Sequence, residues 1–230
     1  MDEPKNIKFG FYLITGILAA STSLIFFGWL AEEVLEAHTV QFDEYVRAAI
    51  HRLASPSLTV AMEVFSFLGS VAFLLGLTMF AIGLFFYLHH SRAAMMLAVT
   101  MAGELALEIT LKYSFHRTRP VAFFGTSPGS YSFPSGHAMG SMCFYGALTV
   151  ILSARIATRA GRAFLYSCTV LLVSAIGVSR ISLGVHYPSD VIAGYLAALF
   201  WVGVVGLTFK LLPSRGVNGP EHPGSASKLA

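Results

Sequence analysis

Long apolar runs separated by short polar segments make up most of the chain. Six of these runs approach or exceed the length of a membrane-spanning helix: Phe9–Ala31, Leu58–Leu88, Ala93–Phe115, Gly136–Ala154, Phe164–Ser182 and Val191–Leu212. Because about 20 apolar residues cross the hydrocarbon core of a bilayer, this pattern predicts an all-α integral membrane protein, a bundle of six transmembrane helices. The run from Leu58 is longer than one span requires, so we expect it to tilt or to begin outside the membrane.

The polar stretch between the first two runs contains one periodic segment. Apolar and charged residues alternate there at helical spacing, with Phe42, Val46, Ala49, Ile50 and Leu53 opposite Asp43, Glu44, Arg47 and Arg52. The pattern predicts a short amphipathic helix over residues 41–54 that lies at the membrane interface. The sequence leaves open whether this helix is a structural collar over the bundle or part of the route by which substrate arrives.

Composition excludes an ordinary soluble domain. Hydrophobic residues make up 55% of the chain and charged residues 12%, with a mean hydropathy of +0.69, whereas soluble domains are about 25% charged. The formal net charge of +3 resides mostly in short loops and gives no evidence of a nucleic-acid partner. Residues 1–212 are expected to form one domain, and the Pro-, Gly- and Ser-rich residues 213–230 a disordered cytoplasmic tail.

The two cysteines, Cys143 and Cys168, both fall inside apolar runs. Free cysteines are among the most frequently buried residues, so we expect two buried free thiols rather than a disulfide. No His or Cys follows either of them at the spacing of a metal site, and no metal centre is expected there.

Orientation follows from the distribution of Lys and Arg between the loops, because cytoplasmic loops carry the excess. With six spans, one side collects Lys5, Lys8, Arg92, Arg155, Arg159, Arg162, Lys210, Arg215 and Lys228. The other side has Arg47, Arg52, Lys112, Arg117, Arg119 and Arg180, together with the acidic Glu32, Glu33, Glu36, Asp43 and Glu44. Both termini are therefore expected to be cytoplasmic, in a multi-pass protein of the cytoplasmic membrane.

Three short polar blocks carry candidate chemistry. The block Ser179–Asp190 contains Arg180, His186 and Asp190, with Pro188 well placed to begin the following helix. Asp190 would then lie in the first helical turn, close enough to accept a hydrogen bond from His186 and to leave the other ring nitrogen free as a nucleophile or base. Alone, a His and an Arg at a membrane boundary are more typical of interfacial anchors.

The other two blocks flank the third and fourth apolar runs. The segment Lys112–Pro120 places Lys112 and Arg119 about two helical turns apart, on one face if the helix persists. Ser132–His137 precedes the fourth run, where Ser135 is a natural N-cap and Gly136 allows close approach of the backbone. Taken separately, the first block is explained by a snorkelling lysine and a basic loop. The second is explained equally well by an ordinary capped helix with an interfacial histidine.

Topology brings the three blocks together. From a cytoplasmic N-terminus, the end of the third span, the start of the fourth and the junction of the fifth and sixth all emerge on the non-cytoplasmic face. Cations, helix N-termini, two histidines and a carboxylate would then converge, and such groups suit a phosphoryl group, which carries negative charge throughout its transfer.

The spacing Lys-x6-Arg-Pro, Pro-Ser-Gly-His and Ser-Arg-x5-His-x3-Asp resembles the type 2 phosphatidic acid phosphatase superfamily, over a motif-bearing core of residues 58–212. The resemblance implies a six-helix fold and hydrolysis of a lipid phosphate without a metal or other cofactor. It implies that His186 is the nucleophile that forms a phosphohistidine, that Asp190 orients it, and that His137 is the acid to the leaving oxygen. The phosphate-binding residues would be Lys112, Arg119, Ser135, Gly136 and Arg180. Haloperoxidases that share these motifs are soluble, which the apolar runs argue against.

Two further ionisable residues lie inside the third run. Glu104 and Glu108 share a helix face with Lys112, and Glu108 has the favourable order for an ion pair with Lys112. We expect both glutamates to support the site rather than to react, because the phosphate requires cations nearby.

Within this resemblance, the substrate stays open among undecaprenyl diphosphate, phosphatidylglycerophosphate and phosphatidic acid, since no motif encodes the lipid. A phosphotransferase that passes the phosphoryl group to another lipid is an alternative, and a non-enzymatic lipid-binding or transport protein is a second. Apart from membrane lipids, no nucleic acid or obligate protein partner is expected.

Overall fold

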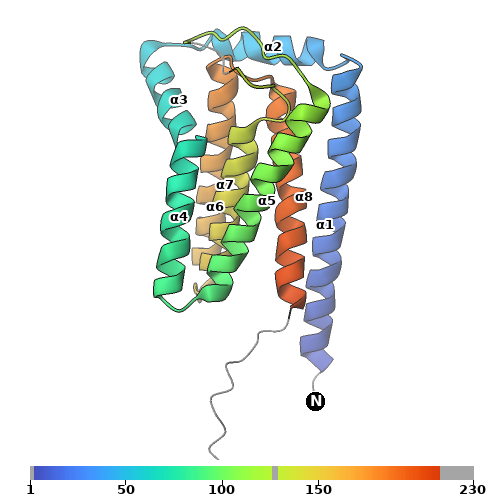
Figure 1. Ribbon diagram of the computed structural model, residues 1–230, viewed down its shortest axis with the longest axis vertical. Helices are drawn as coiled ribbons and strands as arrows, with labels where there is room; N and C mark the ends of the chain where they lie inside the picture. Colours follow the sequence, from blue (N-terminus) through green and yellow to red (C-terminus); the bar gives the residue numbers. More distant parts are fainter. Residues whose placement is uncertain (1–2, 126–128, 213–230) are drawn as a thin grey trace, which may run out of the picture.

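The computed structural model describes residues 3–125 and 129–212, and every regular element in these ranges is an α-helix (Figure 1). The elements in chain order are α1 (Glu3–Leu35), α2 (Val40–His51), α3 (Pro56–Leu68), α4 (Val71–Tyr87), α5 (Ser91–Phe115), α6 (Gly136–Ser153), α7 (Arg159–Ser182) and α8 (Pro188–Leu211). The predicted all-α class is confirmed. The predicted disordered tail lies outside the described residues.

The long helices form a bundle, and α2 lies across one end of it (Figure 1). The helix α6 occupies the interior, where it packs against α4, α5, α7 and α8, while α1 packs mainly on α8. The start of α1 and the end of α8 lie together at the end of the bundle opposite α2 (Figure 1). The described parts of the segment between α5 and α6, and the junction of α7 with α8, lie at the end of the bundle that α2 covers (Figure 1).

Four helices, α1, α5, α7 and α8, contain stretches long and apolar enough to cross a membrane. The pair α3 and α4 gives a fifth span if it is counted as one, with a bend of 45° between its halves. This bend divides the overlong run from Leu58, and the Oγ of Ser70 accepts a hydrogen bond from the N–H of Phe73 to begin α4. The molecule is therefore a helical integral membrane protein. By length and composition, the described part of the chain holds four or five candidate spans.

The predicted amphipathic helix is present as α2, and two residues of its charged face turn toward the bundle. Asp43 and Arg47, which the pattern placed on the polar face, are 0% and 5% exposed, whereas Phe42 and Leu53 are 48% and 71% exposed. Only Ile50 of the apolar set packs on a core cluster, that of Ala138, Ile181 and Val191. The charged residues turn inward because the loops beneath α2 supply hydrogen-bonding partners, which makes burial of a charge tolerable.

The expectation for the cysteines holds for one of the two. Both thiols are free, and Cys143 is buried in α6, but Cys168 is exposed on α7. A thiol behaves as a small apolar group, so the outward side of a bundle helix accommodates it as readily as the interior. The apolar pattern of the run could not distinguish these two environments.

Candidate active site

Three segments from different parts of the chain meet beneath α2. They are the loop after α5, the start of α6 and the junction of α7 with α8. Main-chain hydrogen bonds join them: Ser132 donates to Arg117 over 2.8 Å, Ser135 donates to Asp190 over 2.9 Å, and Phe123 donates to Leu183 over 3.1 Å. The three blocks singled out in the sequence therefore form one site.

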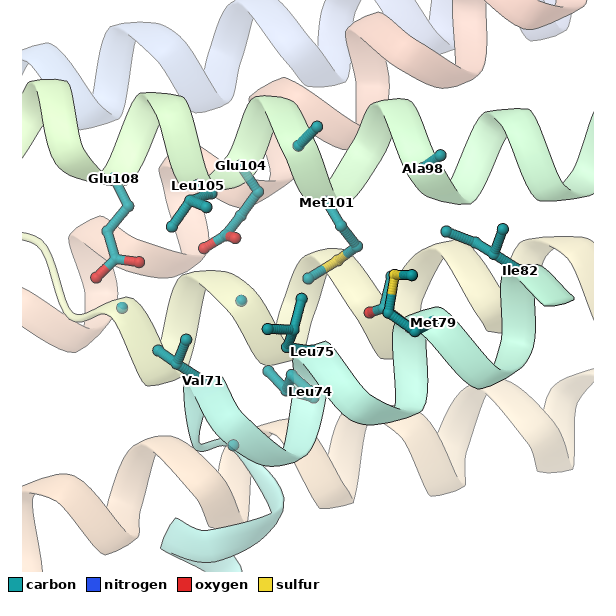
Figure 2. Close-up of a pocket in the computed structure, with 15 residues that line it drawn as sticks. Val71, Leu74, Leu75, Met79, Ile82, Ala98, Met101, Glu104, Leu105 and Glu108 are labelled. Carbon is teal, nitrogen blue, oxygen red and sulfur yellow. The ribbon is translucent and has the colours of Figure 1, made fainter.

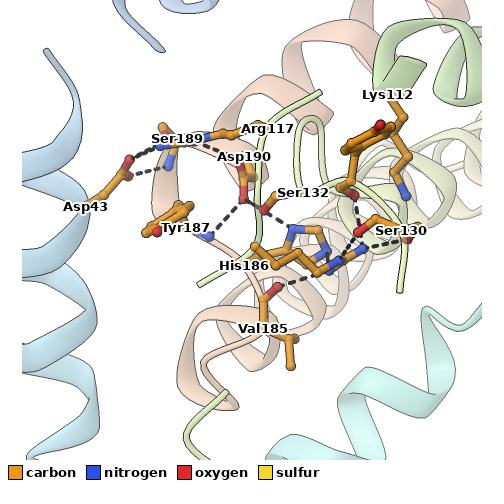
Figure 3. A network of polar contacts seen from close by, with 12 residues as sticks. Asp43, Lys112, Arg117, Ser130, Ser132, Val185, His186, Tyr187, Ser189 and Asp190 are labelled. Carbon is orange, nitrogen blue, oxygen red and sulfur yellow. Dashed lines mark hydrogen bonds and ion pairs between the residues drawn. The ribbon is translucent and has the colours of Figure 1, made fainter. Parts of the chain in front are cut away.

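His186 lies at the centre of this site and is 1% exposed (Figure 3). Its Nε2 is 2.8 Å from Nη1 of Arg119, and its Nδ1 is 3.3 Å from Oδ2 of Asp190. A guanidinium can only donate, so we assign the lone pair to Nε2 and the proton to Nδ1, which donates it to Asp190. Burial lowers the pKa of His186 to about 4, although the hydrogen bond to Asp190 acts in the opposite direction. The imidazole is thus neutral at neutral pH, with Nε2 able to act as a nucleophile.

Asp190 is fully buried and is held by several donors. Its Oδ2 accepts from the main-chain N–H of Tyr187 over 2.9 Å and from the hydroxyl of Ser132, while its Oδ1 accepts from Nη1 of Arg117 over 2.6 Å. Pro188 is the first residue of α8 as the sequence predicted, which places Asp190 in the first turn. These contacts fix the carboxylate against His186.

Arg119 is held by the loop that precedes α6. Its Nε donates to the carbonyl of Ser130 over 2.7 Å, its Nη2 donates to the carbonyl of Tyr131 over 3.2 Å, and its Nη1 donates to the carbonyl of Val185 over 3.0 Å. Burial lowers the pKa of Arg119, which nearby Asp190 and Glu108 oppose. Since a guanidinium stays charged in proteins, Arg119 provides a fixed cation beside His186.

Lys112 and Arg119 do not share a helix face. The helix α5 ends at Phe115, and the following His116 has a left-handed backbone with φ of 48°. The Nζ of Lys112 is instead 2.6 Å from Oε1 of Glu108, the ion pair that their spacing led us to expect. The two cations therefore reach the site from a helix end and from a loop.

The N-terminus of α6 presents unused donors toward the same region. Ser135 is the N-cap residue, but its Oγ makes no side-chain cap and, among the described residues, has no hydrogen-bond partner although it is buried. The same holds for Nε of Arg180, whose Nη1 donates to the hydroxyl of Ser66. A buried donor without a partner is costly, so these two groups suit an anion that the site would bind.

His137 and Gly136 follow Ser135 in the first turn of α6. His137 is partly exposed, and Arg180, His186 and Lys112 are close enough to act on it electrostatically. A Cβ at Gly136 would lie 2.0 Å from Oε1 of Glu108. Glycine is therefore required there for α5 to bring its glutamate against the start of α6.

A cavity of about 360 Å³ opens between α4 and α5, with α6 behind it (Figure 2). Its lining is mostly apolar, but at one end it includes Glu108 and Gly136 of the site. Glu104 projects from α5 toward α6 as well, 5% exposed and beside Gly140. Its Oε1 is without a hydrogen-bond partner within the described part of the chain. Both glutamates thus border the route from the site into the apolar cavity.

The sequence did not identify several residues that hold the site. Arg117 and Ser132 lie inside the blocks quoted above, and their position next to the motif residues could have indicated a role in the site. Asp43 and Ser66 come from α2 and α3, far away in the chain. Nothing in their local sequence distinguishes them from other polar residues near a membrane surface.

The sequence profile of the PAP2 superfamily matches residues 93–212, more than half of the chain. The chain belongs to the PAP2 superfamily. Among its PAP2 relatives, phosphatidylglycerophosphatase B of Bacillus subtilis is 30% identical over 193 residues, which cover 82% of this chain and 95% of that protein. Undecaprenyl-diphosphatase of Sulfolobus acidocaldarius is 29% identical over 110 residues, covering 44% of this chain and 49% of the relative.

A solved structure agrees with this membership. The crystal structure of a transmembrane PAP2-type phosphatidylglycerolphosphate phosphatase from Bacillus subtilis superposes with a TM-score of 0.76 at 28% identity. The match covers 86% of this chain and 99% of that one. The resemblance inferred from the motifs, and with it a hydrolase acting on phosphoric esters, is confirmed.

Proposed function

We propose that this protein is a membrane phosphatase that removes phosphate from a lipid phosphate or diphosphate through a phosphohistidine on His186. The observation that supports this most directly is the arrangement of the His186 ring, with Nδ1 against Asp190 and the Nε2 lone pair beside Arg119. The unpartnered Oγ of Ser135 and Nε of Arg180 provide binding groups for an anion next to it.

In the first step, the phosphate is bound by the cations Lys112, Arg119 and Arg180 and by the start of α6 at Ser135 and Gly136. Nε2 of His186 attacks phosphorus, and the bond between phosphorus and the leaving oxygen breaks. His137 gives its proton to that oxygen, so the lipid leaves as an alcohol or as a monophosphate. Asp190 accepts a hydrogen bond from Nδ1 and stabilises the positive charge that develops on the ring.

In the second step, water replaces the nucleophile. His137, now neutral, takes a proton from water as the oxygen attacks phosphorus, and the bond between Nε2 and phosphorus breaks. Inorganic phosphate leaves, and both histidines return to their starting protonation states. The three cations neutralise the oxygens of phosphorus in both steps, the function that a metal ion serves in other phosphatases.

We further propose six spans, with the site on the outer face of the cytoplasmic membrane and both termini in the cytoplasm. The bent pair of α3 and α4 would be one span, and α6 the sixth. Eleven residues of α6 are buried in the bundle, so it needs few apolar residues on a lipid-facing side. Residues 1–212 would form one phosphatase domain with its core in 58–212, needing no protein partner.

Phosphatidylglycerophosphate is the first candidate substrate. The reason is that the chain matches phosphatidylglycerophosphatase B of Bacillus subtilis over 95% of the length of that relative. The apolar cavity beside Glu108 offers a place for a lipid chain next to the phosphate. Undecaprenyl diphosphate and phosphatidic acid are the other candidates. Phosphate release from each pure lipid in detergent would rank them, and label that moves to a second lipid instead of to water would identify a phosphotransferase.

The two histidines provide the test of this mechanism. With p-nitrophenyl phosphate, whose leaving group needs no proton, His137→Ala should still form a phosphoenzyme and then stall, because no base activates water. His186→Ala should form none. The measurement is radiolabelled phosphate retained on the protein after a rapid alkaline quench, under which phosphohistidine survives. Label on His186→Ala but not on His137→Ala would mean that the roles are reversed.

A further inference from the structure

Asp43 of α2 is a fully buried carboxylate that reaches the start of α8 (Figure 3). Its Oδ1 accepts from the main-chain N–H of Ser189 over 2.9 Å, and its Oδ2 accepts from the hydroxyl of Ser189 over 2.7 Å. Ser189 precedes Asp190 directly in the first turn of α8. A residue of the helix that covers the bundle is thus bonded to the residue next to the carboxylate that holds His186.

Arg117 joins the two carboxylates to each other. Its Nη1 donates to Oδ1 of Asp190 over 2.6 Å and to the hydroxyl of Ser189 over 2.7 Å, and its Nη2 donates to Oδ2 of Asp43 over 2.8 Å. The guanidinium lies over the ring of Tyr187, 4.3 Å from its centroid. The rigid fork of an arginine matches this pair of acceptors in a way that a lysine ammonium cannot.

We propose that Asp43 and Arg117 are positioning residues that set the orientation of Asp190 and, through it, of the His186 ring. This inference rests on the proposed function, since it concerns the same nucleophile. Arg117 binds Oδ1 of Asp190 and leaves Oδ2 facing Nδ1 of His186. Asp43 in turn holds the opposite side of the guanidinium, so the fork cannot rotate away from Asp190.

The charges support this assignment. Three charged groups lie close together here, the carboxylates of Asp43 and Asp190 and the guanidinium of Arg117, which is 13% exposed. Buried charges are tolerated when they are paired and hydrogen-bonded, and removing one partner leaves the other uncompensated. Without Asp43, Nη2 of Arg117 would keep only the longer hydrogen bond to the hydroxyl of Thr39, 3.4 Å. The guanidinium would then be held less firmly against Oδ1 of Asp190.

Attachment of α2 to the bundle does not by itself require Asp43. Arg47 donates from Nη2 to the carbonyl of Val121 over 2.9 Å and lies 4.7 Å from the ring centroid of Phe123. Ile50 packs against the core beneath α2. Since the helix has these other anchors, a change at Asp43 tests the positioning of Asp190 more than the docking of α2.

The experiment measures how fast the full-length protein in detergent forms phosphoenzyme from p-nitrophenyl phosphate. Asp43→Asn, which keeps the shape, and Arg117→Lys, which keeps the charge, should each slow this first turnover by about 10- to 100-fold, as expected for a displaced reacting group. Inhibition by inorganic phosphate should change less than about 2-fold, because Lys112, Arg119 and Arg180 are untouched. The double variant should be little slower than Arg117→Lys alone, since the two residues act as one unit.

Two matched controls come from the same helix. Glu44→Gln changes a carboxylate that is 55% exposed, and Arg52→Ala changes an exposed arginine. Both should retain the wild-type rate of phosphoenzyme formation and the wild-type melting temperature. These controls show whether a slower rate comes from loss of the buried network of Asp43 and Arg117 or from any change in the charge of α2.

Each other result has a definite meaning. Unchanged first turnover in Asp43→Asn and Arg117→Lys overturns the inference, and so does a loss that is accompanied by equally weakened phosphate inhibition. If Arg117→Lys does not fold, Asp43→Asn still decides the matter. If wild-type protein forms no phosphoenzyme while it releases phosphate, the proposed function fails instead, which the same experiment reports.

Discussion

At the scale of single residues, the site depends on keeping one histidine neutral. His186 is buried among cations, and burial disfavours the charged imidazolium. Asp190 opposes this effect through its hydrogen bond to Nδ1. The result is a ring with a lone pair on Nε2 and a fixed proton on Nδ1, the form that a phosphohistidine mechanism requires before substrate binds.

The pKa of His186 should therefore be far lower than that of an ordinary histidine. Its pKa of about 4, lowered mainly by burial, means that Nε2 stays unprotonated at neutral pH and gains a proton only when the pH falls through about 4. NMR of isotope-labelled histidine in the detergent-solubilised protein, with His186→Ala to assign the signal, measures this directly. In Asp190→Asn the midpoint should be lower still, because the contact that raises it is gone. A wild-type midpoint near 6.5 would contradict this account.

The motif spacing predicted which candidate site residues would converge. It did not predict the residues that hold them in place. His186 and Asp190 are four residues apart at a helix start, so their contact follows from local geometry. Asp43 and Arg117 are brought together only by the position of α2 across the bundle. Lys112 and Arg119 would have shared a helix face if the helix had continued past Phe115. It does not, because His116 adopts a left-handed backbone and ends α5 before Arg119.

At the scale of helices, periodicity predicted α2 but not the side that faces the protein. In water an apolar stripe identifies the buried face, whereas at a membrane surface lipid accepts apolar side chains and the protein interior offers ion pairs. Phe42 is accordingly half exposed while Asp43 is buried. The correct orientation depends on partners such as Ser189, which the local sequence does not reveal.

Helix contacts depend on glycines where large side chains cross. The ring of Trp201 on α8 lies against Gly103 of α5, and its Nε1 donates to the carbonyl of Thr100 over 2.9 Å. A Cβ at Gly103 would lie 2.0 Å from Cζ2 of that ring. The indole is held by its hydrogen bond, so it cannot move aside without losing a contact.

Gly103→Ala should therefore destabilise the bundle by about 1–3 kcal/mol, the usual cost of overpacking. Thermal unfolding in detergent should show this as a melting temperature lower by about 2–4 °C for each kcal/mol. Gly83→Ala is the matched control, because nothing lies within 4 Å of a Cβ there. It should be neutral or slightly stabilising. Equal melting temperatures for the two variants would show that close packing of Gly103 against Trp201 does not determine the stability of the bundle.

At the scale of the whole molecule, alternation of spans brought the three blocks together, and this could be predicted from the sequence. Segments that follow the third and fifth spans must emerge on one face, whatever the packing. The count of six spans stays a prediction, because α6 lies inside the bundle and is not among the helices that are apolar enough to cross a membrane by length and composition. Its small and polar residues serve contacts with four neighbouring helices.

The orientation of the bundle in the membrane is the remaining prediction at this scale. Five of the six cations at the end covered by α2 are hydrogen-bonded or ion-paired within the site: Arg47, Lys112, Arg117, Arg119 and Arg180. Acidic residues accompany them there, whereas the opposite end carries the basic loop at Arg155, Arg159 and Arg162. Because an excess of Lys and Arg marks cytoplasmic loops, the end covered by α2 should face outward.

Two single cysteines, placed in a Cys168→Ser background, test this orientation. One is Tyr45→Cys on α2, at a position where the native tyrosine is 72% exposed. The other is Ala157→Cys, in the exposed loop between α6 and α7. A membrane-impermeant maleimide added to intact cells should label position 45 and leave position 157 unlabelled until the cells are permeabilised. The buried Cys143 should stay unlabelled in both conditions and serves as the background. Labelling of position 157 in intact cells, with position 45 protected, would place the phosphate site in the cytoplasm, where it would act on lipids of the inner leaflet.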